Sequence, residues 1–200
     1  ECSIPLLHAF HRYMGNYIAG LVELGFTVYT EDSLLSFLSG KPNAFIINVA
    51  QIELEEYVMP LREEAQFDEY IYSEVVDLNA VNLNSWFEIS PLNAEEDETL
   101  FFASLYLTDD MEGYFRQYPF TGEVRFSYEV DTLQLDAVYS LGALAGYLYS
   151  GYTFDYLLNS YLDKKSEEEG FERSDTYYHF DRRRNYLGKA GEGARFIPME

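Results

Sequence analysis

Side chains able to do chemistry are few in this chain, and the first to weigh are two histidines. His8 and His11 lie three residues apart on a predicted helix, so both could point to one side and share a metal ion. A metal site would need one or two further ligands, and none stands at a suitable spacing. Because His8 also borders the apolar stripe of the helix, we expect a structural or surface role and no metal site.

Carboxylates form two further groups that could bind a cation or exchange protons. Asp109, Asp110 and Glu112 resemble a fragment of a calcium-binding loop, but the alternating acidic spacing of such loops is missing. Glu31 and Asp32 follow a short predicted strand, where carboxylates could hold Mg²⁺ or act as acid and base. The same two residues also suit the first turn of a helix, and we favour that structural role.

Motifs for nucleotide binding and for nucleophilic catalysis are missing. The pair Gly40 and Lys41 lacks the upstream glycine and the following Ser or Thr of a phosphate-binding loop. No G-x-S-x-G sequence is present, and Cys2 has no histidine near it in a known catalytic arrangement. A hydrolase using Glu31 or Asp32 would need partner residues from distant parts of the chain. We therefore expect no cofactor, no metal and no enzymatic activity.

The C-terminal stretch has the pattern that most favours binding to another protein. Three consecutive arginines lie among aromatic residues, and Arg, Tyr and Phe are favoured at protein interfaces. The predicted partner-binding residues are Tyr177, Tyr178, Phe180, Arg182, Arg183, Arg184 and Tyr186. These side chains could wrap around an acidic partner, or they could fold back on the acidic body of the same chain. The sequence leaves both alternatives open.

Charge is the most unusual property of the composition. The net charge is −22, and residues 1–160 hold 5 Lys+Arg against 26 Asp+Glu, a net of −21. Residues 161–200 hold 8 against 9, a net of −1. The acidic body would repel nucleic acids and anionic membranes, so we expect no direct nucleic-acid binding. It suits a basic partner, a cation-rich setting or simple solubility.

Membrane association and compartment depend on two short features. Residues 137–154 form an uncharged run of 18, but four Tyr, two Ser and three Gly within it favour packed soluble helices over a membrane span. The single cysteine, Cys2, excludes an internal disulfide and hints at a lipoprotein of the cell envelope, although Glu1 is a poor neighbour for lipoprotein cleavage. The compartment stays unknown. Membrane association is expected only through a partner or a lipidated N-terminus.

The first 68 residues are predicted to form a small α/β layer. In order, we expect a helix at 3–26, a strand at 26–29, a helix at 34–38, a strand at 44–50 and a helix at 52–66. The strand at 44–50 is nearly all apolar, which is typical of a strand buried on both faces. Strands joined through helices favour parallel pairing.

The rest of the chain changes character. We expect strands at 71–76, 79–90, 100–107 and 124–130, with a bulge near Asn79 because the apolar alternation changes phase there. Residues 131–162 are predicted to form two helices, broken near Gly151 and packed on this antiparallel sheet. Residues 166–200 are predicted to be an extended arm. The fold class is therefore α+β, with the parts 1–68, 69–165 and 166–200, the first two in one continuous domain.

Two hypotheses of function follow. The first is a non-enzymatic subunit of a larger protein assembly, associated with the cell envelope, that contacts its partner through the C-terminal arm. The second is an acidic decoy, a nucleic-acid mimic or an immunity protein, that binds a basic cleft. In the second, four glutamates on the predicted helix 52–66 would imitate a row of phosphates: Glu53, Glu56, Glu63 and Glu64.

Overall fold

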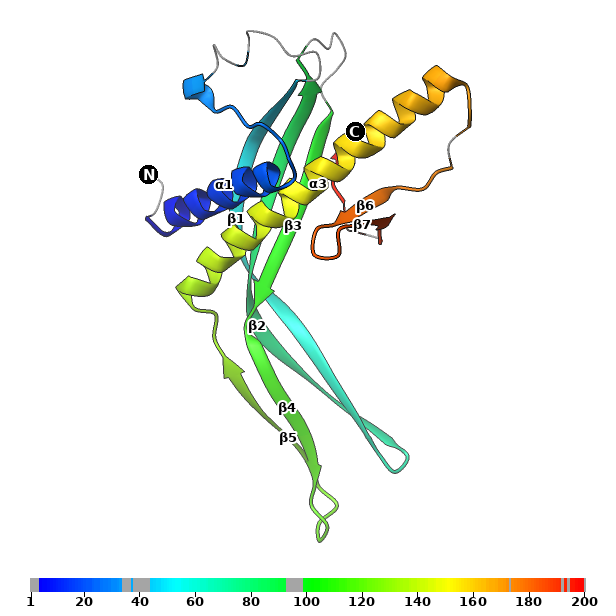
Figure 1. Cartoon of the computed structure of the whole chain (residues 1–200). Helices are drawn as coiled ribbons and strands as arrows, with labels where there is room; N and C mark the ends of the chain where they lie inside the picture. Colours follow the sequence, from blue (N-terminus) through cyan, green and yellow to red (C-terminus); the bar gives the residue numbers. More distant parts are fainter. Residues whose placement is uncertain are drawn as a thin grey trace.

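The computed structural model describes residues 4–33, 37, 44–92, 99–172, 174–191, 193 and 195–199. The molecule is a four-stranded sheet with two helices on one face, and two long hairpins project from it (Figure 1). The element order is α1 (Ile4–Glu23), η1 (Glu31–Ser33), β1 (Phe45–Phe67), β2 (Tyr70–Pro91), β3 (Leu100–Thr108), β4 (Asp110–Gln117), β5 (Val124–Asp131), α3 (Leu135–Glu169), β6 (Tyr178–Asp181), β7 (Tyr186–Lys189) and β8 (Ile197–Met199).

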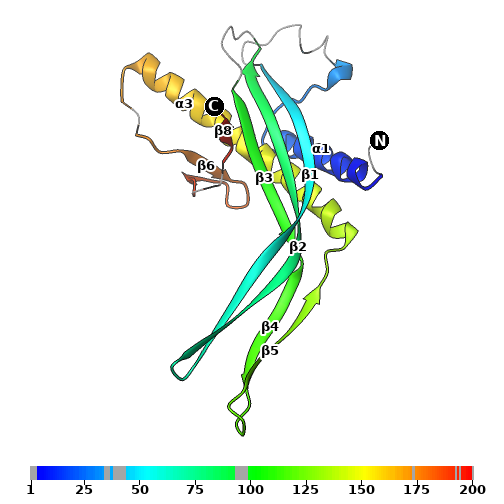
Figure 2. The ribbon, with the colours of Figure 1, turned by 180° about the vertical axis from the view of Figure 1, so that it is seen from behind.

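The main sheet has the order β1-β2-β3-β8, and all its neighbouring strands are antiparallel. β1 pairs with β2 from Phe45↔Pro91 to Phe67↔Tyr70, whereas β3 reaches only the stretch Ala80–Glu88 of β2. Residues 58–79 therefore leave the body as a two-stranded hairpin, the β1–β2 arm. β4 and β5 form a second hairpin, the β4–β5 arm of residues 110–131, which diverges from the first (Figure 2).

The core lies between the two helices and the sheet and is rich in aromatic rings. Its buried members are Tyr13, Tyr17, Leu21, Leu83, Phe87, Ile89, Phe101, Ala103, Leu141, Ala145, Tyr149, Leu157 and Phe196. Phe87 and Phe196 lie with ring centroids 4.7 Å apart, so a residue from the C-terminal end of the chain completes the core. Two glycines let α1 and α3 approach closely: a Cβ at Gly142 would come within 2.6 Å of the Ala9 carbonyl oxygen, and one at Gly146 would collide with that of Tyr13.

The predicted N-terminal helix–strand–helix layer is wrong. Residues 26–29 form no strand, and residues 52–66, expected to be helical, belong to the single long strand β1, which pairs antiparallel with β2. Strand alternation is present in the sequence at Ile52 and Leu54 and again at Tyr57, Met59 and Leu61, but its change of phase resembles a helical pattern. The predicted helix at 34–38 lies, apart from one residue, outside the described residues.

The predicted helix pair is also wrong, because α3 runs unbroken through Gly151 for 35 residues. An isolated glycine inside a helix costs only about 1 kcal/mol, so it does not by itself end one. A Cβ at Gly151 would lie 3.1 Å from the guanidinium of Arg182, so this glycine makes room for a side chain. The helix ends at Gly170, whose left-handed conformation (φ 70°) is typical of a helix C-terminus.

The remaining strand predictions were closer. β3 and β5 match the predicted strands, and the buried positions of β2 change phase as expected, from Val76, Leu78 and Ala80 to Leu83 and Phe87. The predicted bulge near Asn79 is wrong, because the register shift in the pairing of β1 with β2 lies in β1, between Val49 and Gln51. The buried residues of β2 therefore lie on one face in the body, at Leu83 and Phe87, and on the opposite face toward the arm, at Val76 and Leu78.

The prediction of an extended C-terminal arm is wrong, because this segment forms a hairpin and a strand that is added to the main sheet. β6 pairs with β7, and β8 pairs with the edge of β3. In the described part of the chain, no helix has both the length and the apolar character that crossing a bilayer requires. Cys2, on which the lipoprotein hypothesis rests, lies outside the described residues.

Candidate interaction surfaces

The β6–β7 hairpin contains the residues that the sequence marked for binding, and its turn is locally ordered. β6 and β7 pair from Tyr178↔Lys189 to Asp181↔Tyr186. Between them the Asp181 carboxylate accepts hydrogen bonds from the backbone amides of Arg183 (2.9 Å) and Arg184 (3.1 Å). A side chain that bonds the backbone two residues onward favours a turn, so the sequence D-R-R-R-N turns tightly here.

Two buried side chains of α3 hold β6 in place, and we call them the α3 clamp: Asp155 and Asn159. The Asn159 amide donates to the Tyr178 carbonyl (2.8 Å) and accepts from the Tyr178 backbone amide (3.0 Å). The Asp155 carboxylate accepts from the Phe180 amide (2.9 Å) and contacts His179 Nδ1 (2.6 Å). The clamp thus takes the place of a neighbouring strand and fixes the hairpin on the helix.

Asp155 and His179 also have the arrangement of an acid–base pair. Asp155 is fully buried, and burial raises the pKa of its carboxyl, while bonds from His179 and the Phe180 amide oppose that rise. A buried carboxylate that orients an imidazole is typical of a general base, but catalysis also needs a nucleophile and a substrate pocket. Among the described residues, no hydroxyl or thiol bonds to His179. The pair is accounted for by docking of the hairpin.

Arg182 points into the protein and is largely buried. Its guanidinium donates to Ser150 Oγ (2.6 Å) and to the Tyr147 carbonyl (3.1 Å), and it lies 4.3 Å above the Tyr147 ring. A carboxylate oxygen of Glu23 in α1 lies 3.8 Å away, so this arginine joins the hairpin to both helices. Arg182 therefore folds back on the body of its own chain, which was one of the two alternatives left open by the sequence.

The other predicted binding residues divide into an inward and an outward set. The inward set is half-buried: Tyr177, Tyr178 and Phe180. The Phe180 ring packs 5.4 Å from Phe154 of α3, and burial raises the pKa of the Tyr177 hydroxyl. The outward set is exposed at the turn: Arg183, Arg184 and Tyr186. These three side chains remain available to a partner.

The β1–β2 arm is a surface that the sequence reading missed. Large apolar side chains are exposed along it, including Tyr70 (69%) and Ile71 (70%) at its tip. Glu63 stands directly opposite Glu74 in the strand pairing. The sequence analysis missed this arm because it predicted a helix at 52–66. The alternation of apolar residues at 57, 59 and 61, which is typical of a strand, was the signal that could have predicted it.

The β4–β5 arm presents aromatic side chains at its end. Phe115 and Phe126 pack across the strands with centroids 4.7 Å apart. Near the turn, the guanidinium of Arg125 lies 5.4 Å from the centroid of the Tyr118 ring, and Phe120 beyond it is fully exposed. Single exposed apolar side chains are normal on protein surfaces, so this tip by itself carries no functional argument.

The metal and acid–base candidates of the sequence are structural or isolated. His8 packs on the Tyr139 ring at 4.5 Å, and no group of three or more potential ligands occurs among the residues described. Asp109 is buried and bonds the Asn79 amide (2.8 Å) and the Leu133 amide (2.8 Å), so it fixes the corner where the β4–β5 arm leaves the sheet. Glu31 and Asp32 are exposed and lie in the first turn of the short helix η1.

An apolar hollow lies between α1 and the sheet. Its volume is ≈ 210 Å³, and its lining includes Leu7, Phe10, Tyr13, Ile52 and Leu54. Ligand pockets usually measure about 300–1,000 Å³ and contain a few converging polar groups. The hollow is smaller and almost entirely apolar, so it gives no ground for a reaction.

Comparisons with protein-family models, with curated proteins and with solved structures found no match for this chain. Inferences about its function therefore rest on the surfaces described above.

Proposed function

We propose that this protein is a non-enzymatic interaction subunit of a larger protein assembly, and that it contacts an acidic partner through the exposed turn of the β6–β7 hairpin. One observation carries the proposal: the α3 clamp fixes the inner side of the hairpin, while Arg183 and Arg184 stay exposed at its turn. We also propose a location in the cell envelope, for which Cys2, a candidate lipidation site, is the sole support.

Rigidity and charge both support a binding role for this turn. A turn ordered before binding loses little conformational entropy when a partner is bound. Residues 177–189 contain four Lys+Arg and one Asp+Glu, a net charge of +3 in a chain of −22. Arg184 is exposed over 83% of its side chain, and it has one long contact, 3.7 Å, with Asp181. Two guanidinium groups on a fixed turn suit bidentate binding of carboxylates.

The test reverses the two exposed charges. Arg183→Glu with Arg184→Glu is expected to weaken co-purification of a protein partner from the native source by about tenfold or more, since each contact becomes repulsive. Partner amounts are measured by quantitative mass spectrometry. Deletion of residues 171–200 is unsuitable because Phe196 belongs to the core.

The control is Lys164→Glu with Lys165→Glu at the distal end of α3, which changes the net charge by the same amount. Lys165 forms only a surface ion pair with Glu168, so its loss costs little stability. If both double variants retain the same partners as the unmodified chain, the turn is not the contact.

A further inference from the structure

We infer that the β1–β2 arm is a second docking surface, and that its occupant is a basic, partly apolar segment of a partner protein. The inference does not depend on the role of the β6–β7 hairpin, which lies beside α3 in the body, whereas this arm projects away from it (Figure 1).

The arm lacks the cover that a two-stranded hairpin normally needs. Before Ala80, β2 has no pairing with β3, and Asn79 bonds to Asp109. Both outer edges of the arm therefore lack a strand partner over residues 58–78 within the described structure. An isolated two-stranded hairpin is at best marginally stable in water, and free strand edges invite pairing with another chain. The arm therefore presents unused backbone and side-chain surface.

One face of the arm presents its side chains in rows across the two strands. Paired residues share a face, so Leu61 with Val76, Glu63 with Glu74, and Ala65 with Tyr72 form successive rows there. Val76 is buried near the root, whereas Tyr70, on the same face at the tip, is 69% exposed. The face is thus covered at its root and open toward its tip.

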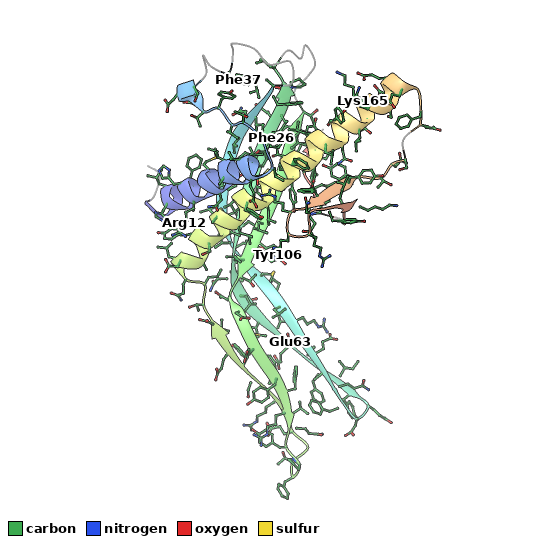
Figure 3. All side chains as sticks on the ribbon, viewed as in Figure 1. Arg12, Phe26, Phe37, Glu63, Tyr106 and Lys165 are labelled. Carbon is green, nitrogen blue, oxygen red and sulfur yellow. The ribbon has the colours of Figure 1, made fainter. Side chains whose placement is uncertain are left out.

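A pair of glutamates lies in the middle of this face. Glu63 and Glu74 stand opposite each other, and like charges in that position repel. Figure 3 shows Glu63 on the projecting arm, away from the helices. The single arginine of the arm, Arg62, points to the other face, where it binds Glu64 at 2.8 Å. A cation supplied by another molecule would relieve the repulsion.

Charge selects the occupant. Residues 58–79 contain one Arg and six Asp+Glu, a net of −5, and the whole chain has a net of −22. A second copy of the arm, a nucleic acid or an anionic membrane would be repelled. Successive rows on one face lie two residues apart along a strand. A bound strand with a basic residue, and apolar residues two positions before and after it, would place a cation on the glutamate row and apolar groups on the rows beside it.

The test uses a fluorescein-labelled synthetic peptide of twelve residues, three repeats of Val-Ser-Lys-Ser, in which Val and Lys alternate along one face of a strand. We call it the Lys–Val peptide. Binding to the full chain is measured by fluorescence anisotropy at several salt concentrations. We expect saturable binding that weakens with salt and a dissociation constant raised about tenfold by Glu63→Gln with Glu74→Gln. The control, Glu167→Gln with Glu169→Gln at the end of α3, makes the same change in net charge and is expected to leave the constant within about twofold.

Apolar contacts are tested separately. Tyr70→Ser is expected to weaken peptide binding by about fivefold, whereas Tyr161→Ser, at a side chain of similar exposure on α3, leaves it unchanged. A second peptide, the Lys–Ser peptide, has Ser in place of each Val and is expected to bind more weakly than the Lys–Val peptide.

Four outcomes would overturn the inference. They are the absence of binding to the Lys–Val peptide, an equal loss in the arm variant and the α3 control, and equal binding of the Lys–Ser peptide. The fourth is concentration-dependent self-association lost in Glu63→Gln with Glu74→Gln, which would make a second copy the occupant. Failure of the peptide test leaves the β6–β7 proposal intact, and loss of a partner with the Arg183 and Arg184 variants leaves this inference intact.

Discussion

Buried polar residues in this protein hold chain segments together. Asp155 and Asn159 bond the backbone of β6, Asp109 bonds two separate backbone segments at a corner, and Arg182 joins the C-terminal hairpin to α3. Each of these groups would be costly to leave without a partner in the interior. The hydrogen-bonding groups of these side chains are thus used to hold the fold together.

The α3 clamp gives a prediction about stability. Asn159→Ala removes both hydrogen bonds to the Tyr178 backbone and is expected to lower the free energy of unfolding by about 1–3 kcal/mol. Urea denaturation measures the loss of stability. Hydrogen exchange in residues 178–189 should be faster in the variant than in the unmodified chain. Asn16→Ala, which removes an exposed bond to the Arg12 carbonyl, serves as the control and should change little. An unchanged midpoint for the Asn159 variant would contradict the clamp.

Asp109 predicts a pH dependence. Hydrogen bonds from the Leu133 and Asn79 amides lower the pKa of its carboxyl below the usual 3.8. A lowered pKa in the folded state means that the stabilisation is complete above the unfolded value and is lost as pH falls through the folded value. Asp109→Asn should therefore be less stable than the unmodified chain near neutral pH, and the difference should shrink below about pH 4.

Urea midpoints at about pH 7, 4.5 and 3 measure this difference. Other carboxylates are common to both proteins and cancel in the comparison. Asp110→Asn, at an exposed neighbour, is the control and should show no such pH-dependent difference. A constant difference between the Asp109 variant and the unmodified chain across this range would contradict the assignment.

At the scale of elements, the contact between α1 and α3 depends on small residues. Gly146→Ala is expected to destabilise the protein by about 1–3 kcal/mol, because the new methyl group would meet the Tyr13 backbone, although alanine favours the helix. Gly15→Ala, where nothing lies within 4 Å, is expected to stabilise by about 0.5–1 kcal/mol. Denaturation midpoints that move in the same direction for both variants would contradict the close helix contact.

Elements with an unambiguous period could be predicted from the sequence. The first helix, β3 and β5 follow clear periods and were found at nearly the predicted positions. β1 was missed because its alternation changes phase, and α3 was divided because Gly151 resembles a break until Arg182 is seen beside it. Contacts between distant segments determine the structure of both β1 and α3. The apolar period within one segment cannot reveal such contacts.

The candidate site was predictable only in part, for a related reason. The cluster of Arg and Tyr in the C-terminal stretch marked a surface, but Arg182 and Arg183 are adjacent and take opposite roles. One points inward and the other outward because the clamp fixes β6 on α3, and the clamp residues Asp155 and Asn159 lie 24 and 19 positions before the residues they bond, His179 and Tyr178. The four glutamates expected on one helix lie on β1, where Glu53 and Glu63 take one face and Glu56 and Glu64 the other.

At the scale of the whole molecule, the β1–β2 arm is acidic and the β6–β7 hairpin is basic. The β1–β2 arm has a net charge of −5, and residues 177–189 have +3. The arms extend beyond the body, and the β6–β7 hairpin is fixed beside α3 (Figure 2). A chain with separate acidic and basic surfaces suits a protein that joins two partners of opposite charge.

Hydrogen–deuterium exchange of the complex purified from its native source tests the interaction role most directly. Slower exchange in residues 181–189 on partner binding is the result that our proposal predicts, with further protection in residues 58–79 where a basic partner is present. Unchanged exchange in both segments, with protection gathered instead around the hollow beside α1, would contradict the proposal.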